Sequence, residues 1–243
     1  MTKLRNTAAL TGLATLMLAA APQASADDLS ANVGISNNYI WRGLTQTENG
    51  TAVSGGIDYA ADGGFYAGTW VSNVSYAPGD VFSYEHDIYL GYAGEYSGFS
   101  YDIGWLYYNY DESAEYDFSE LYASLGYGGF SVTAWILVHA ERDSIVDPSY
   151  DFDFGDAFYL QADYAYEIKD GLELGLHVGY HDGDWVDEFN FADGTTDYVD
   201  YNVSLSKGGF SFVVSGTDLS DSPTGLQNDE VKYVISYTID LDL

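Results

Sequence analysis

The side chains that most often carry catalysis are scarce in this chain, and they are not arranged for it. There are four histidines (86, 139, 177 and 181), and none has a serine nucleophile or a G-x-S-x-G elbow beside it. The sequence has no cysteine, which removes thiol nucleophiles, disulfides and thiolate zinc sites. Carboxylates are so numerous that a pair of them says nothing about acid–base roles. We therefore expect no enzyme and no cofactor.

Acidic residues dominate the chain. Thirty-eight Asp and Glu stand against seven Lys and Arg, which gives a formal charge of −31. No basic surface is available to meet phosphates, so we expect no nucleic-acid partner. The acids of the stretch from His181 to residue 188 do not have the spacing of a calcium loop, and we expect no metal site there.

The first 26 residues read as a cleaved signal peptide. Lys3 and Arg5 precede an apolar stretch, and Ala24-Ser25-Ala26 is an A-x-A cleavage signal. Removing these two positive charges from −31 leaves −33 on residues 27–243, which we expect to form one exported domain. No later stretch has the length of unbroken apolar sequence that a transmembrane helix needs.

Apolar and polar residues alternate through most of the remaining chain, which predicts β-strands. We expect twelve strands, near residues 30–42, 52–60, 64–73, 84–93, 99–107, 121–127, 130–138, 158–166, 172–180, 198–206, 209–217 and 231–243.

The connections between these strands fall into two alternating classes. The short ones hold a glycine followed by a large apolar residue, as in Gly128-Gly129-Phe130. The long ones include the strongly acidic stretches Glu141–Asp156 and His181–Asp197. Short periplasmic turns alternating with long external loops are typical of an outer-membrane barrel. The sequence therefore predicts an all-β, up-and-down transmembrane barrel of about twelve strands, and the alternative is a secreted soluble β-protein.

In such a barrel the apolar parity faces lipid and the polar parity faces the interior. Aromatic residues near the long loops would form the outer girdle: Tyr39, Trp41, Trp70, Tyr107 and Tyr180. The candidates to line the pore or its mouth are charged residues of the other parity or of the strand ends: Arg42, Glu85, Asp87, Asp102, Glu120, Asp163, Glu173, Asp200 and Glu230.

Arg42 is the only Lys or Arg between Arg5 and Arg142. Its parity on the first strand points it into the interior near the mouth. If the first strand pairs with the last, Asp229 or Glu230 would be its partner across the seam, with Glu48 as a third candidate. The alternative is an arginine that only snorkels at the membrane interface.

The chain resembles the TorF family of proteins regarded as porins. The resemblance is carried by Asn38–Thr47, Val53–Tyr59, Gly64–Asn73 and His86–Tyr92, together with the alternating last strand. It implies an outer-membrane barrel of the porin kind.

Pattern and resemblance together lead to one functional expectation and one alternative. We expect a narrow, cation-preferring channel for passive diffusion of small hydrophilic solutes in the outer membrane of a Gram-negative bacterium. Its partners would be outer-membrane lipid and lipopolysaccharide, the barrel-assembly machinery, and small solutes or cations. The alternative is a plugged barrel with a structural or surface-binding role, because bulky aromatic residues share the inward parity.

Overall fold

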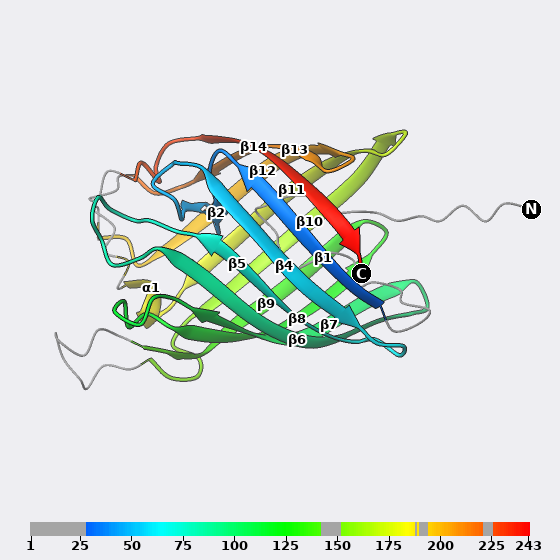
Figure 1. Ribbon diagram of the computed structural model, residues 1–243, viewed down its shortest axis with the longest axis horizontal. Helices are drawn as coiled ribbons and strands as arrows, with labels where there is room; N and C mark the ends of the chain where they lie inside the picture. Colours follow the sequence, from blue (N-terminus) through cyan, green and yellow to red (C-terminus); the bar gives the residue numbers. More distant parts are fainter. Residues whose placement is uncertain (1–27, 142–151, 188, 190–193, 221–225) are drawn as a thin grey trace, which may run out of the picture.

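The computed structural model describes residues 28–141, 152–187, 189, 194–220 and 226–243, which form a closed antiparallel β-barrel of twelve strands. Neighbours in the chain are neighbours in the wall, and β14 closes on β1 (Figure 1). The predicted fold class is confirmed. The wall strands are β1 (Asp28–Ser36), β4 (Ala52–Ala60), β5 (Phe65–Asn73), β6 (Tyr84–Tyr96), β7 (Phe99–Asn109), β8 (Phe118–Tyr127), β9 (Phe130–Ala140), β10 (Phe158–Lys169), β11 (Leu172–Asp182), β12 (Asp197–Lys207), β13 (Phe210–Thr217) and β14 (Lys232–Asp242).

The short connections are tight hairpin turns, as their glycines predict. Tyr127 pairs with Phe130, so only Gly128 and Gly129 join β8 to β9. Both glycines have positive φ, at 60° and 85°. A two-residue turn of this kind matches the twist of the strands it joins, which fixes the register of the hairpin.

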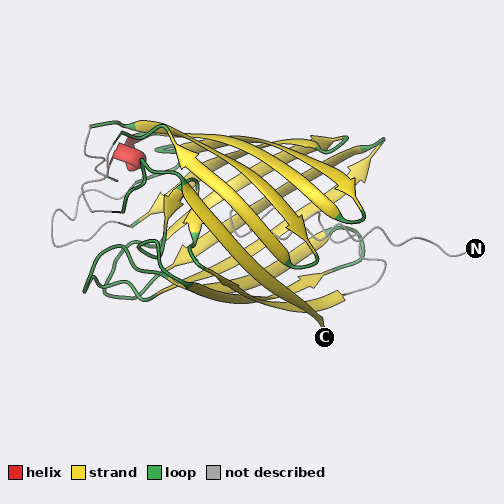
Figure 2. Cartoon of the chain, turned by 90° about the horizontal axis from the view of Figure 1, so that it is seen from above, coloured by secondary structure: helices red, strands yellow, loops and turns green. Residues whose placement is uncertain are grey.

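The short turns lie at the barrel end that holds the start of β1 and the end of β14. The long connections and the one-turn helix α1 (Asp184–Asp187) lie at the opposite end (Figure 2). The expected signal peptide, residues 1–26, lies outside the described residues, as do three of the six acids of the predicted 141–156 loop: Asp143, Asp147 and Asp151. No helix in the described ranges is long and apolar enough to cross a membrane.

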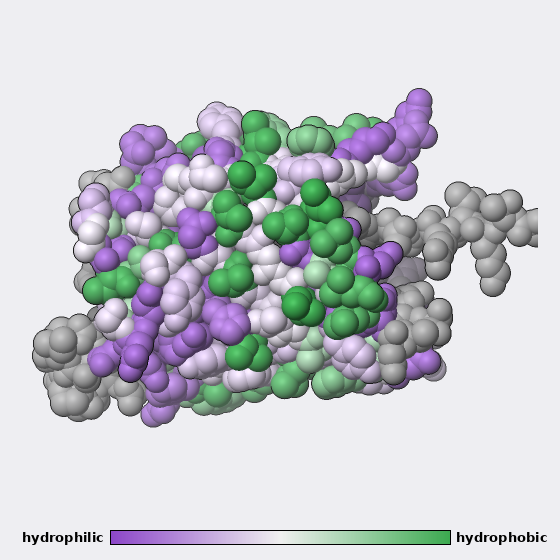
Figure 3. Space-filling model, in the orientation of Figure 1, coloured by the Kyte–Doolittle hydropathy of each residue, from purple (hydrophilic) through white to green (hydrophobic). Residues whose placement is uncertain are grey.

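The outer surface of the wall is apolar over much of its height. Side chains such as Ile35 and Leu125, exposed at 52% and 57%, point away from the interior. In Figure 3 the hydrophobic residues gather over the wall, and hydrophilic ones are concentrated towards the long-loop end. An exposed apolar belt of this extent would be costly in water and is typical of a surface that faces hydrocarbon.

The prediction for the first strand is wrong at its end. β1 stops at Ser36 instead of continuing to residue 42, and the chain then leaves the wall. Residues 40–45 form a separate two-stranded sheet of β2 (Ile40–Trp41) and β3 (Leu44–Thr45), which folds inside the barrel. We call residues 37–51, which hold this sheet, the interior hairpin.

Candidate functional site in the barrel interior

Two asparagines turn the chain from the wall into the interior. The amide side chain of Asn37 donates to the carbonyl of Tyr233 at 3.0 Å and accepts from the amide of Ile235 at 2.7 Å. It thus replaces ladder bonds on β14 where β1 stops. Asn38 accepts from the hydroxyls of Thr45 and Thr47, which ties together the base of the hairpin. Polar side chains satisfy the backbone, so the turn inward leaves few buried groups unpaired.

The tip of the interior hairpin is a two-residue turn of Arg42 and Gly43. Trp41 pairs with Leu44, and the φ angles of the two turn residues are 46° and 80°. A hairpin turn with two positive φ angles accepts glycine readily and other residues at a cost. A side chain on Gly43 would also collide with the wall, because its Cβ would lie 2.5 Å from Thr217 Cγ2 and 2.7 Å from Asp200 Cβ.

The hairpin spans the cross-section of the barrel. Tyr39 packs edge-on against Trp70 of β5 at 5.4 Å and donates to Glu85 of β6 at 2.7 Å. On another side, Ile40 packs with Val213 of β13 and Val234 of β14.

Trp41 extends these contacts further around the wall. Its ring meets Tyr108 of β7 and Phe118 of β8 edge-on, and it also packs against His181 of β11 and Trp185 of α1. A single hairpin therefore contacts wall strands on every side of the interior.

Arg42 is held on the wall opposite its own attachment. Its Nη2 donates to Glu120 Oε2 at 2.6 Å, and its Nη1 lies 3.1 Å from His181 Nε2. The guanidinium carbon lies 4.3 Å from the ring centres of Trp41 and Tyr159 and 5.7 Å from that of Trp135. These wall residues come from β8, β9, β10 and β11, whereas the hairpin is rooted between β1 and β4.

The charge of Arg42 is compensated in place. Its side chain is buried, with 5% of its surface exposed. Burial alone would lower the pKa of the guanidinium, but attraction to Glu120, the hydrogen bond to it and the nearby Tyr108 and Tyr159 together outweigh burial and raise the pKa of Arg42. A buried ion pair with additional aromatic contacts holds a charged side chain where an isolated one would be strongly disfavoured.

The predicted seam partners of Arg42 are wrong. Asp229 and Glu230 are exposed on the turn before β14, and Glu48 instead accepts from the Ser75 hydroxyl at 2.8 Å. The physical reason is the inward turn at Asn37, which carries Arg42 across the barrel to Glu120.

The girdle prediction fails for three of its five residues for related reasons. Tyr39 and Trp41 travel inward with the hairpin, and Trp70 packs against Tyr39 inside the barrel. Tyr107 and Tyr180 keep the outward parity of their strands.

The nine candidates for the pore and its mouth divide by exposure. Those buried in the interior are Arg42, Glu85, Asp87, Asp102, Glu120 and Asp200. Asp163 and Glu173 face the interior and are partly exposed, whereas Glu230 is exposed at the long-loop end and does not face inward. Most of the predicted acids thus face the barrel interior. Of these candidates, only Glu120 forms an ion pair with Arg42.

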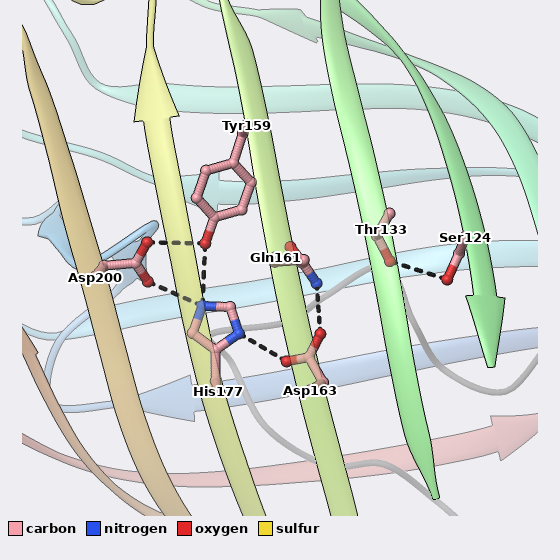
Figure 4. Close-up of polar contacts among 7 residues, drawn as sticks. All are labelled: Ser124, Thr133, Tyr159, Gln161, Asp163, His177 and Asp200. Atoms are coloured by element: carbon pink, nitrogen blue, oxygen red, sulfur yellow. Dashed lines mark hydrogen bonds and ion pairs between the residues drawn. The ribbon is translucent and has the colours of Figure 1, made fainter. Parts of the chain in front are cut away.

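A second polar cluster centres on His177 of β11 (Figure 4). Its Nδ1 lies 2.7 Å from Asp163 Oδ1, and its Nε2 lies 3.0 Å from both Asp200 Oδ1 and the Tyr159 hydroxyl. Tyr159 also donates to Asp200 at 2.9 Å. Because a carboxylate faces each ring nitrogen, this geometry suits an imidazolium that donates from both.

The interior aromatic rings pack over glycines of neighbouring strands, as their shared parity predicts. A Cβ on Gly104 would lie 2.6 Å from Tyr122 Cζ, and one on Gly68 would lie 2.5 Å from a ring carbon of Tyr89. The rings therefore lie flat against the wall where glycine leaves room. This arrangement narrows the interior and also fixes the orientation of the tyrosine hydroxyls.

Three buried polar atoms have no hydrogen-bond partner within the described residues: Asp87 Oδ1, Trp135 Nε1 and Ser211 Oγ. In the described part of the chain, no group of three or more histidine or carboxylate side chains is arranged to hold a metal ion. The interior is acidic and aromatic and is crossed by one hairpin.

Sequence reasoning missed the wall residues that hold Arg42, namely Trp135, Tyr159 and His181. It also missed Asn228, whose Oδ1 accepts from the backbone amide of Thr45 at 3.2 Å. A local signal for the hairpin did exist, because Gly43-Leu44 repeats the glycine and large apolar residue of the short turns.

The fold and interior define a closed twelve-stranded antiparallel β-barrel with an apolar outer surface and a polar interior. The chain belongs to the Gcw_chp family, described as bacterial protein of unknown function, whose model matches residues 20–237. This match does not carry the TorF name suggested by the sequence. No curated protein matches the chain.

Solved structures support the fold. A KdgM porin shares 12% identity over 88% of this chain and 99% of its own, with a TM-score of 0.52. A NanC porin shares 9% identity over 88% of this chain and 98% of its own, with a TM-score of 0.50. At these identities the likeness concerns the fold alone. One KdgM porin structure holds a disordered oligogalacturonate.

Proposed function

We propose that this protein is an outer-membrane channel through which small hydrophilic solutes diffuse passively, with a preference for cations. Outer-membrane lipid and lipopolysaccharide would contact its apolar belt, and the barrel-assembly machinery of a Gram-negative bacterium would insert it. Barrel closure supports this proposal, because a closed wall leaves no strand edge unpaired in hydrocarbon. The porin-like fold of its structural neighbours supports it as well.

The observation that carries the cation preference is the charge of the interior. Arg42 is neutralised by Glu120. Two other basic side chains, Lys232 and His177, face the interior. They are outnumbered by inward-facing carboxylates, which include Asp58, Glu85, Asp87, Asp102, Asp163, Glu173 and Asp200. A low-dielectric wall lined with one sign of charge concentrates the opposite ion and repels its own.

The interior hairpin would set the size limit of the channel. It crosses the section that solutes must pass, and ion-pair, aromatic and apolar contacts pin it on several sides. The channel would therefore be narrow in spite of its twelve strands.

Planar-bilayer recording tests this function. Refolded protein should give discrete conductance steps, and under a KCl gradient the reversal potential should take the sign of potassium permeation. Anion selectivity would contradict the proposal.

A second candidate is a plugged barrel with a structural or surface-binding role. Contacts of the hairpin on every side of the interior favour it. Liposome swelling separates the two functions, because a plugged barrel would leave the vesicles impermeable to small sugars, amino acids and ions.

A further inference from the structure

Two carboxylates of β6, Glu85 and Asp87, differ in the hydrogen bonds that the protein donates to them. Both are almost fully buried, at 2% and 3% exposure, and both have the inward parity of the strand. Glu85 accepts from the hydroxyls of Tyr39 and Tyr110, each at 2.7 Å. Asp87 Oδ1, in contrast, has no hydrogen-bond partner within the described residues. A buried carboxylate oxygen without a partner is costly, and such an atom calls for an explanation.

The basic side chains of the described part of the chain are engaged elsewhere. Arg42 binds Glu120, and Lys232 donates to the carbonyl of Leu226 at 2.8 Å. Lys169 and Lys207 lie at the ends of β10 and β12 next to the short turns and are exposed. The described residues therefore supply no lysine or arginine side chain to the Glu85–Asp87 pair.

Aromatic residues flank the unpartnered oxygen. Asp87 lies directly opposite Trp70 of β5 and directly opposite Tyr108 of β7. Side chains opposite each other on one face of a sheet are near neighbours. A carboxylate between aromatic side chains is a favourable setting for a cation, because ring faces attract positive charge.

We propose that Glu85 and Asp87, with Trp70 and Tyr108, form a binding site for a monovalent cation, either an alkali ion or a small alkylammonium. The inference rests on the proposed channel function, of which the site would be one step. A divalent ion is disfavoured, because hard divalent cations take six or more oxygen ligands or keep several waters, and no group of three carboxylate or histidine side chains is assembled in the described residues.

The site borders the interior hairpin directly. Tyr39 is part of the hairpin, and its hydroxyl donates to Glu85. A cation at Asp87 would thus lie beside the constriction and partly offset the charge of the carboxylate that holds Tyr39. A cation that enters the narrow section of the channel would therefore bind there, at Asp87.

A binding titration tests the site without requiring conduction. Tryptophan fluorescence of the refolded full chain is followed while KCl or methylammonium chloride replaces N-methylglucamine chloride at constant ionic strength. We expect a saturable change with either cation, and the tighter one identifies the class of ligand. Asp87→Asn should weaken the apparent affinity at least about tenfold, which corresponds to roughly 1.4 kcal/mol.

Asp170→Asn is the matched control, because it removes one carboxylate from an exposed turn and should titrate like the unmodified protein. Heat-dependent gel mobility shows whether Asp87→Asn has folded, and Asp87→Glu, which keeps the carboxylate, should retain binding. A linear response of the unmodified protein to both cations would overturn the site, as would unchanged affinity in folded Asp87→Asn. Conduction without binding would refute only the site, whereas binding without conduction would refute only the channel.

Discussion

Arg42 lies at the tip of the interior hairpin and is buried against the wall opposite the root of that hairpin. Its guanidinium forms an ion pair with Glu120 and lies close to three aromatic rings, all in a buried setting. Because a buried charge without its partner is strongly disfavoured, the two residues should behave as one energetic unit.

Replacing Arg42 with Met should destabilise the barrel by about 3–5 kcal/mol, because Glu120 is left buried and unpaired. Urea unfolding in detergent or lipid measures this change. Adding Glu120→Gln should recover much of the loss, and strictly additive effects would contradict the coupling. Lys169→Gln is the control: its ion pair with Asp170 is 78% and 74% exposed and 3.7 Å long, and should be worth less than about 1 kcal/mol.

Gly104→Ala tests the packing of rings over glycines. The new methyl group would lie 2.6 Å from Tyr122 Cζ, and Tyr122 cannot easily move because it packs on Trp135 at 4.4 Å between ring centres. We expect a loss of about 1–3 kcal/mol in the free energy of unfolding. Gly34→Ala is the matched case, since its nearest atoms would be flexible hydroxyls at 3.2 Å, and it should cost clearly less. Equal losses would argue against ring packing as the reason for Gly104.

At the scale of elements, the interior hairpin is separable from the wall. The backbone amide of Gln46 donates to the backbone carbonyl of Tyr39 at 2.7 Å, so the two halves of the hairpin are already hydrogen-bonded at that point. Residues 40–45 can therefore be replaced by Asn-Gly, which closes a two-residue turn between Tyr39 and Gln46.

This shortened hairpin, combined with Glu120→Gln to avoid an unpaired buried charge, should increase single-channel conductance severalfold while the barrel still folds. Planar-bilayer recording measures the conductance, and heat-dependent gel mobility checks the fold. Unchanged conductance in a folded variant would mean that the hairpin does not limit the channel.

A connection outside the wall should respond to pH. Asp111 accepts from the amide and hydroxyl of Ser83, at 2.6 and 2.7 Å, and from the amide of Tyr84 at 3.2 Å. Although burial alone would raise the pKa of Asp111, these hydrogen bonds outweigh it and lower the pKa.

A carboxyl group with a lowered pKa stabilises the folded state above its ordinary pKa and loses that contribution as pH falls through the lowered value. Asp111→Asn should therefore melt below the unmodified protein at neutral pH, and the difference should shrink below about pH 3. Thermal unfolding at both pH values checks this. A difference that persists unchanged in acid would contradict the assignment.

The interior hairpin marks the limit of what the sequence predicts at this scale. The apolar parity of β1 is interrupted at Asn37 and resumes at Tyr39 and Trp41, so periodicity still favours one long strand. Gly43-Leu44 resembles the short turns, and Arg42 takes a positive φ that arginine seldom adopts, so the sequence marks this turn only weakly. Only the asparagines at 37 and 38 hint at a departure from the wall, through contacts that require β14 and β3 to be in place.

For the whole molecule, the barrel could be predicted because loop length and hydrophobic alternation can be read from short stretches of sequence, and together they are typical of one architecture. The turns at 128–129 and 208–209 and the alternation of β14 each indicate the same architecture. The pairing of Arg42 with Glu120 could not be predicted, because it joins the tip of the interior hairpin, rooted between β1 and β4, to β8 on the opposite wall and depends on the reach of the hairpin across the closed barrel.

The most direct test of the central claim is the reversal potential of the refolded protein in a planar bilayer under a KCl gradient. The account predicts a small conductance and a reversal potential of the sign set by potassium, because uncompensated carboxylates line a section that the interior hairpin narrows. A folded barrel that does not conduct, or a reversal potential set by chloride, would contradict it.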